Sequence, residues 1–258
     1  MSDGKLDEAD VRAMVRLVGE AASRGSSHLA ARRYLMEGLK KLIDADCWVW
    51  SLGYLESEKP PVYVSIQHEG FDEDRFTQFL QAVEHPEMTA LTAPFAAEVM
   101  KSPRAQVTRL RQEIDPENRL ATTDASVFWQ AANIYPVMLS AHPLDERCVS
   151  IIGVYRRLDQ PLFAERERQI AHILMTEVPW LHANGWPHDF GVETPTLPRS
   201  RRLVLNLLLE GHSRKQVADK LDLSLHTVSG YIKDIYRTFK VHSHAELMRR
   251  FAKMEAAK

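Results

Sequence analysis

The sequence predicts an α+β domain, with helices around an antiparallel sheet, followed by a smaller all-α domain of four helices. Four strand-like runs and several helical periodicities share the first 183 residues, whereas only short helical periodicities follow residue 196. Between them, residues 184–196 hold two Gly, two Pro and no periodicity, as a linker would. We therefore expect a first domain at 1–185, a linker at 186–196 and a second domain at 197–258.

The first domain should begin and end with helices. The expected elements are helices at about 6–22 and 27–43, strands at 47–55 and 62–68, mostly helical or irregular chain at 71–132, strands at 134–141 and 147–155, and a helix at 161–183. The first helix places Val11, Met14, Val15 and Val18 on one apolar face. Short polar loops separate the strands of each pair, which favours two antiparallel hairpins.

Capping residues mark the helices of the second domain. The first helix, about 200–210, stops before Gly211, a residue suited to the left-handed position after a helix. The second opens at Ser213, with Gln216 three residues on to complete a capping box. Ser224 is the expected N-cap of the third helix. A fourth helix should start at Ser243, with Glu246 forming a second capping box.

The third helix has one apolar stripe and one polar, basic face. Val228, Ile232, Ile235 and Phe239 repeat at i, i+4, i+7 and i+11, so they should be buried. The residues that project away from this stripe are His226, Ser229, Gly230, Lys233, Arg237 and Lys240. Small residues that admit base edges, beside cations that reach bases or phosphates, favour insertion into the major groove of DNA. The alternative is a helical bundle whose basic face is simply solvated.

The spacing of residues in this stretch is typical of one family. The matching residues are Leu197, Val204, Leu205, Glu210, Gly211, Ser213, Val217, Ala218, Leu221, Leu223, Ser224, Thr227, Val228, Ile232, Ile235, Tyr236, Phe239, Val241, Ala245, Glu246 and Leu247. Over about 55 residues they resemble the LuxR-type helix-turn-helix, a four-helix DNA-binding module. The resemblance implies that the third helix enters the major groove and that the fourth contributes to a dimer contact.

Carried over by position, the resemblance assigns roles to individual residues. The groove candidates are His226, Thr227, Ser229, Gly230, Lys233 and Arg237, with basic Lys240 on the same face. Lys215, near the start of the second helix, would lie by the phosphate backbone. The dimer candidates on the fourth helix are Leu247, Phe251 and Met254.

The stretch also departs from the family pattern. Ser200-Arg201 stands where the family usually has Arg-Glu, and Tyr231 replaces a common His. The usual Lys-Leu-Gly is Thr238-Phe239-Lys240, and a late Arg is His244. We expect these changes to remove an internal ion pair while the fold is kept, and they leave the operator sequence unassigned.

Charge, cysteine content and hydropathy indicate the binding partner and the cellular compartment of the protein. Residues 197–258 carry 13 Lys and Arg against 6 Asp and Glu, a net of +7, so the remainder carries −9 within the total of −2. A basic end on an acidic body is expected if only the end binds nucleic acid. Cys47 and Cys148 lie in apolar runs and are expected to be buried thiols. No apolar run is long enough for a membrane span, and the acidic N-terminus is unlike a signal peptide, so a cytoplasmic protein is expected.

The element order of the first domain is that of a PAS- or GAF-like sensor fold, and the run at 161–183 resembles the closing helix of GAF-like input domains. Aromatic residues on or beside the expected strands are candidates for a ligand pocket: Trp48, Trp50, Tyr63, Trp129 and Tyr135. The alternative is that these rings only fill the core. Acyl-homoserine-lactone sensors carry a Trp, Tyr and Asp-Pro constellation that cannot be laid on this chain, since Asp115-Pro116 lacks the preceding aromatics.

Other protein classes fit less well. Strands and helices do not alternate as in a phosphoreceiver domain. The sequence has no nucleotide-binding glycine loop, no HExxH and no GxSxG, so no catalytic residue, metal site or cofactor is expected. The sequence thus predicts a dimeric transcriptional regulator that binds double-stranded DNA. Its first domain would bind a small effector or, alternatively, only dimerise. A catalytic domain with a DNA-binding tail is the less favoured alternative.

Overall fold

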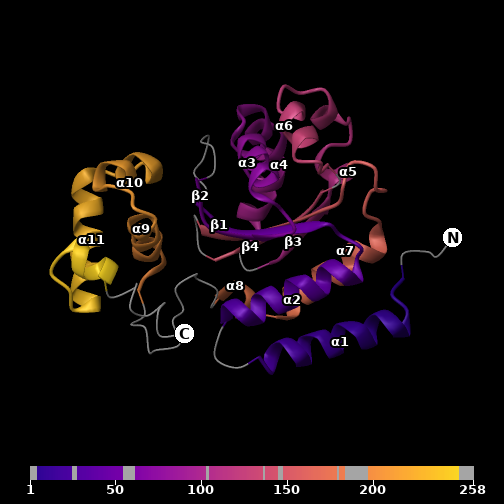
Figure 1. Cartoon of the computed structure of the whole chain (residues 1–258), viewed down its shortest axis with the longest axis horizontal. Helices are drawn as coiled ribbons and strands as arrows, with labels where there is room; N and C mark the ends of the chain where they lie inside the picture. The colour runs from indigo at the N-terminus through magenta and orange to yellow at the C-terminus, as the bar shows by residue number, and fades with distance from the viewer. Residues whose placement is uncertain are drawn as a thin grey trace. The chain divides into compact units, whose positions relative to one another are not determined.

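The computed structural model divides the chain into two compact units, Met1–Gly185 and Trp186–Lys258. It describes residues 5–24, 28–54, 62–102, 105–135, 137–144, 148–178, 180–183 and 197–249. The expected linker at 186–196 lies outside these residues. Figure 1 shows the two units, and each is treated by itself below.

A five-stranded antiparallel sheet forms the centre of the N-terminal unit, in the order β2-β1-β5-β4-β3. The strands are β1 (Cys47–Tyr54), β2 (Val62–Glu69), β3 (Val107–Leu110), β4 (Val137–Pro143) and β5 (Cys148–Tyr155). The α+β prediction is confirmed. The sequence reading missed β3, because four residues with polar Thr108 and Arg109 at the centre give almost no strand signal.

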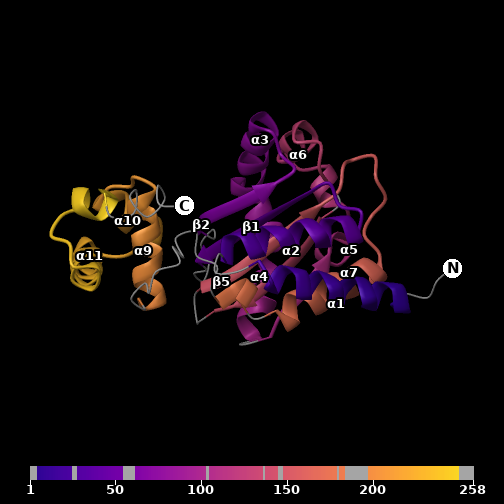
Figure 2. The same cartoon turned by 60° about the horizontal axis from the view of Figure 1, so that its bottom comes forward.

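Helices cover both faces of the sheet (Figures 1 and 2). On one face lie α2 (His28–Leu42), α7 (Glu165–Glu177) and α8 (Trp180–Ala183), with α1 (Glu8–Ala22) packed outside α2. On the other face lie α3 (Glu73–Glu84), α4 (Pro86–Lys101), α5 (Arg111–Ile114), the short 3-10 helix η1 (Arg119–Ala121) and α6 (Ser126–Ala131).

The buried face of α1 differs from the expected one. Met14, Leu17 and Ala21 are buried, whereas Val11 and Val15 are 46% and 68% exposed. The reason lies on α2, where a Cβ added at Gly38 would come within 2.1 Å of a Leu17 methyl carbon. The glycine therefore lets Leu17 approach closely, and this contact sets the rotation of α1 about its axis.

The expected helix at 161–183 is two helices. The chain leaves helical geometry at Val178, which has φ −115° and ψ 75°, and α8 begins at Trp180. Residue 179 is a proline in the sequence, and the residue before a proline is disfavoured in the helical region.

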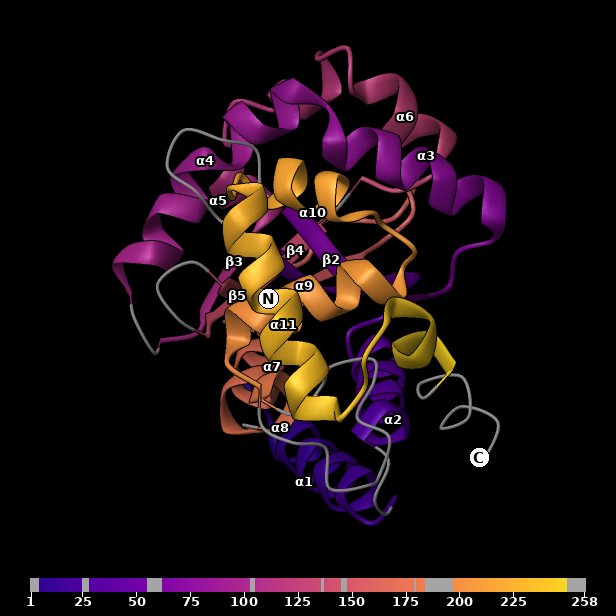
Figure 3. The same cartoon turned by 90° about the vertical axis from the view of Figure 1, so that its left-hand side faces the viewer.

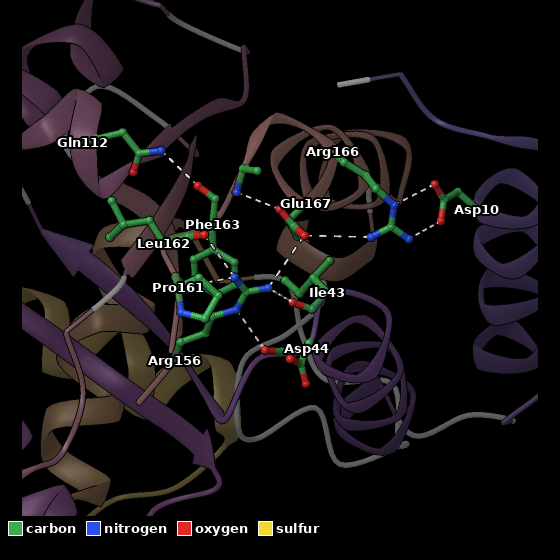
Figure 4. A network of polar contacts seen from close by, with 11 residues as sticks. Asp10, Ile43, Asp44, Gln112, Arg156, Pro161, Leu162, Phe163, Arg166 and Glu167 are labelled. Atoms are coloured by element: carbon green, nitrogen blue, oxygen red, sulfur yellow. Dashed lines mark hydrogen bonds and ion pairs between the residues drawn. The ribbon is translucent and has the colours of Figure 1, made fainter. Parts of the chain in front are cut away.

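Buried arginine contacts join the elements of the first unit (Figure 4). The guanidinium of Arg156 donates to the carbonyl oxygens of Ile43 (2.6 Å), Asp44 (2.9 Å), Pro161 (3.1 Å) and Leu162 (3.2 Å). It therefore ties the end of α2 and the residues after it to the chain that leads into α7. In the same region Arg166 of α7 donates through Nε to the Asp10 carboxylate of α1 at 2.9 Å.

The C-terminal unit consists of α9 (Arg199–Leu209), α10 (Arg214–Leu221), α11 (Leu225–Phe239) and a further helical stretch at 244–249 (Figure 3). These bounds match the helices that the capping residues predict. Gly211 has φ +89°, the left-handed conformation expected after the first helix. Within the described part of the chain, no helix is long and apolar enough to cross a membrane.

Candidate DNA-binding surface and ligand cavity

The turn between α10 and α11 is fixed by local hydrogen bonds. Ser213 and Gln216 form the expected capping box, with Ser213 N donating to Gln216 Oε1 at 2.8 Å. Asp222 ends α10 in the left-handed region at φ 47°, which Asp tolerates better than most residues. Ser224 then caps α11 by accepting from the amide of Thr227 at 3.0 Å.

The rotation of α11 about its axis agrees with the sequence prediction. Val228, Ile232, Ile235 and Phe239 are all buried against α9 and α10. The exposed residues include six of the seven candidates on or at the end of α11: His226, Ser229, Gly230, Lys233, Arg237 and Lys240. Lys215 on α10 is exposed as well. Thr227 is half-buried, and its hydroxyl lies 2.8 Å from that of Ser224, so it helps to cap the helix.

An ion pair connects α9 to the exposed face of α11. Arg201 of α9 donates to Asp234 at 3.3 Å and lies over the Tyr231 ring, 4.7 Å from its centroid. The other oxygen of Asp234 accepts from Arg237 at 3.0 Å. The ion pair that the departures at Ser200-Arg201 and His244 are expected to remove is a different one, and its loss stays a prediction. The module does contain an internal ion pair. An arginine on α9 and a carboxylate on α11 supply the pair.

The dimer candidates divide into two groups. Leu247 is fully buried inside the unit, so its side chain belongs to the core and not to an open face. Phe251 and Met254 lie outside the described residues.

A cavity of about 130 Å³ lies in the N-terminal unit, between the sheet and the helices α3 to α6. Its lining is mainly apolar, with Val49 and Ile151 of the sheet facing Phe79, Leu91 and other helix residues. A concave, mostly apolar space with a few polar groups is the usual form of a small-molecule site.

Three of the five aromatic candidates line this cavity, namely Tyr63, Trp129 and Tyr135. Burial raises the pKa of the Tyr63 phenol to about 12. Trp129 donates its indole N–H to Met88 Sδ at 3.4 Å. The Tyr135 hydroxyl donates to Asn118 Oδ1 at 2.6 Å and accepts from Arg111 at 2.8 Å.

Trp48 and Trp50 lie on the opposite face of the sheet, so their assignment to this pocket is wrong. Trp48 donates to Glu37 of α2 at 2.7 Å, and Trp50 donates to Ser150 Oγ at 2.9 Å. Side chains alternate between the two faces of a strand, and at β1 the cavity receives Val49 and Ser51 instead. For this pair, the reading of the rings as core residues is confirmed.

On the sheet side of the cavity, the sequence reading missed two polar residues, Ser51 and Tyr155. Burial raises the pKa of the Tyr155 phenol well above its usual value, so the hydroxyl stays protonated. Alternation along β1 and β5 is the sequence signal for both residues, because Ser51 lies on the strand face opposite the two tryptophans and Tyr155 follows Gly153 by two positions.

Thiols and metal ligands add no further site in the part of the chain that the structure describes. Cys47 is buried, and burial raises the pKa of its thiol. The Cys148 side chain is outside the described residues. No group of three or more His, Cys, Asp or Glu in the described ranges is placed to hold a metal ion.

The geometry of the second unit defines a helix-turn-helix DNA-binding domain. Residues 196–251 match the model of the family described as "Bacterial regulatory proteins, luxR family". The C-terminal unit therefore belongs to this family, and the chain carries the DNA-binding domain of a LuxR-type transcription regulator.

Several solved structures resemble the chain at low sequence identity. SdiA of Escherichia coli is 13% identical with a TM-score of 0.43, over 94% of this chain and 95% of that chain. The ligand-binding domain of VqsR from Pseudomonas aeruginosa is 12% identical with a TM-score of 0.45, over 68% and 95%. CepR2 from Burkholderia cenocepacia, an N-acylhomoserine-lactone-dependent factor, is 14% identical with a TM-score of 0.43, over 67% and 94%. No curated protein matches the chain.

Proposed function

We propose that the chain binds operator DNA as a homodimer and that a small effector in the N-terminal cavity regulates this binding. In this proposal residues 1–185 are the sensor, 186–196 the linker and 197–258 the DNA-binding domain. A regulator of bacterial genes works where the chromosome is, so the proposal places the protein in the cytoplasm.

The exposed face of α11 supports the DNA contact. Lys233 and Arg237 are one helical turn apart on the side opposite the buried stripe, and Ser229 and Gly230 precede them. A Cβ added at Gly230 would meet nothing within 4 Å, so this part of the helix leaves room for a base edge. Lys215 at the start of α10 extends the basic surface toward the phosphate backbone.

The cavity is the observation that supports an effector. Well-packed cores have few voids larger than a water molecule, so an apolar space of about 130 Å³ is unusual and large enough to hold a small ligand. Ala96 on α4 lines the cavity, whereas its neighbour Ala97 is exposed. Ala96→Leu should fill the space and alter operator affinity or its response to effectors, while Ala97→Leu should not. Identical DNA binding by both variants, with and without added apolar compounds, would remove the effector from the proposal.

The homodimer can be tested first in the C-terminal domain, where Phe251 and Met254 are the proposed contacts. Because Leu247 is a core residue, truncating the chain before it would unfold the domain, so Phe251→Ala with Met254→Ala is the better test. Loss of the dimer in sedimentation, with folding retained, would support the assignment. If the double variant is still a dimer, Phe251 and Met254 do not form the dimer interface.

A second candidate role for the N-terminal unit is dimerisation alone. The exposed Val11 and Val15 on α1 favour it, because two large apolar side chains face water on one helix. Val11→Glu with Val15→Glu should then abolish the dimer without unfolding the chain. If the dimer persists, this surface is not the interface.

A further inference from the structure

The charge of the cavity lining limits the ligands that it can hold. Glu84 is the only ionisable acid or base, tyrosines aside, among the described residues of the lining, and no Lys, Arg or His occurs there. Glu84 is exposed at the end of α3, so its charge stays in solvent. A carboxylate or ammonium group inside the cavity would be desolvated with no oppositely charged partner, at a large cost in free energy.

Three hydroxyl groups supply the polar part of the sheet side, from Ser51 of β1, Tyr63 of β2 and Tyr155 of β5. Ser51 and Tyr155 are only 6% and 4% exposed. None of the three side chains forms a hydrogen bond with another residue in the described ranges. Polar groups that line a mostly apolar space are the usual anchors of a small ligand, so these hydroxyl groups are placed to bond a partner that the protein alone does not provide.

The register of the sheet brings these groups to one region. Val49 pairs with Gly153, and Ser51 follows two residues along β1. The Tyr155 ring turns back over Gly153, where an added Cβ would lie 2.4 Å from the phenol oxygen. Tyr63 pairs with Gly53, the next residue after Ser51 on the same face of β1. Gly153 therefore leaves the space that the Tyr155 phenol occupies, whereas the space at Gly53 is bounded by Ile151 and Val149.

The size of the cavity sets the size of the ligand. At about 130 Å³ it is comparable with an apolar cavity of roughly 150 Å³ that binds benzene in another protein. A molecule of one ring or a short branched chain would fill it without moving α3 or α4.

We infer that the effector is a compact, uncharged molecule with an apolar body and one hydrogen-bonding group, and that this group contacts Ser51, Tyr63 and Tyr155. The inference rests on the proposed effector role of the cavity. It specifies the chemistry of the ligand that this chain's own lining residues select.

Binding of four matched probes to the full-length chain tests the charge requirement: benzyl alcohol, benzoate, benzylamine and toluene. Calorimetry and thermal shift are the measurements, with Ala96→Leu as the filled-cavity control. Benzyl alcohol should bind at least about tenfold more tightly than benzoate or benzylamine, because neither ion finds a partner. Ala96→Leu should abolish binding of benzyl alcohol and toluene, and Ala97→Leu should leave it unchanged.

The hydroxyl contact is tested with Tyr155→Phe and Tyr63→Phe. Each substitution should lower the affinity for benzyl alcohol by about tenfold, which corresponds to the loss of one hydrogen bond, and leave the affinity for toluene unchanged. Tyr34→Phe is the matched control, since the Tyr34 hydroxyl bonds Glu20 between α1 and α2, on the other face of the sheet. An equally large fall in toluene affinity would show a packing effect and overturn the hydroxyl assignment.

The outcomes separate this inference from the effector role itself. If benzoate or benzylamine binds more tightly than benzyl alcohol, and Ala96→Leu abolishes this binding, the ligand is not uncharged but the cavity is still a ligand site. Tighter binding of 1-decanol than of 1-hexanol, again abolished by Ala96→Leu, would overturn the compact size. If none of these probes binds and Ala96→Leu has wild-type DNA binding, both the inference and the effector role fail.

Discussion

Asp234 shows how a single residue can adjust the DNA-binding surface. Its two oxygens hold Arg201 and Arg237, and the Arg237 side chain is 76% exposed on the face proposed to enter the groove. The carboxylate thus orients one cation of this face and offsets part of its positive charge.

Asp234→Asn should therefore strengthen binding to non-specific duplex DNA several-fold, because it removes a negative charge from the basic face. Stability should fall by less than about 1 kcal/mol, since partly exposed ion pairs contribute little. Fluorescence anisotropy with an operator and a scrambled duplex, at several salt concentrations, measures both affinities. Unchanged non-specific affinity would show that Asp234 does not face the DNA.

At the residue scale, the sequence predicts best where a pattern has only one physical solution. Helical periodicity places Val228 and Ile235 in the core and Lys233 outside, and the structure agrees. Alternation also places Trp48 and Trp50 on one strand face. It cannot say which face meets the cavity, because both faces of this sheet are covered by helices. Only the tertiary arrangement decides between them.

At the scale of elements, Arg156 joins α2 to the chain before α7 through four carbonyl groups. Its side chain is 6% exposed and its guanidinium lies 4.2 Å from the Phe163 ring centroid. The contact is local in space but links residues more than 100 positions apart in the sequence.

Arg156→Met should lower the free energy of unfolding by about 3 kcal/mol, because the buried Ile43 carbonyl and three part-buried carbonyl groups are left without their charged donor. The corresponding fall in Tm is roughly 6–12 °C for a unit of this size. Arg157→Met is the control, since Arg157 is half-exposed and pairs only with Asp46 in the described chain, so it should cost less than about 1 kcal/mol. Equal effects of the two variants in calorimetry would contradict the role given to Arg156.

The contact between α1 and α7 should make stability depend on acid pH. Hydrogen bonding from Arg166 holds the pKa of Asp10 below its ordinary value of 3.8. A depressed folded-state pKa adds stability above the unfolded-state value, and this stability is lost as the pH falls through the folded-state pKa. Asp10→Asn should therefore destabilise the chain at pH 7, with a difference from wild type that shrinks below about pH 4. Urea unfolding across this range measures it, and a constant difference would refute the linkage.

Among the elements, capped helices are predictable from the sequence and the short edge strand β3 is not. Ser213 and Ser224 define the starts of α10 and α11 because a cap is a local hydrogen bond that sequence spacing reveals. The strand β3 has no such local signal, since its pairing with β4 is a contact between residues some 30 positions apart. The rotation of α1 likewise depends on Gly38 of another helix.

At the scale of the whole molecule, charge separates the two units. The basic end carries +7 and the remainder −9, so contact with phosphate is restricted to the C-terminal domain. The N-terminal unit supplies a mostly apolar cavity whose lining includes the Ser51, Tyr63 and Tyr155 hydroxyl groups. The sequence predicted the two units and the exposed basic face of α11, and both are present in the structure. The sequence could not predict the cavity, which depends on how α3 to α6 pack over the sheet.

The most direct test of this account is the affinity of the full-length chain for double-stranded DNA between roughly 50 and 200 mM salt, compared with that of the Lys233→Ala, Arg237→Ala double variant. We predict a steep fall of log affinity with log salt for the wild type. The double variant should bind DNA more weakly, by about 1–3 kcal/mol for each of the two side chains that contacts a base. If a side chain contacts a phosphate instead, the plot of log affinity against log salt should become less steep. The Tm of the double variant should equal that of the wild type. Salt-independent binding, or a double variant that binds like the wild type, would contradict the assignment of α11 as the DNA-reading helix.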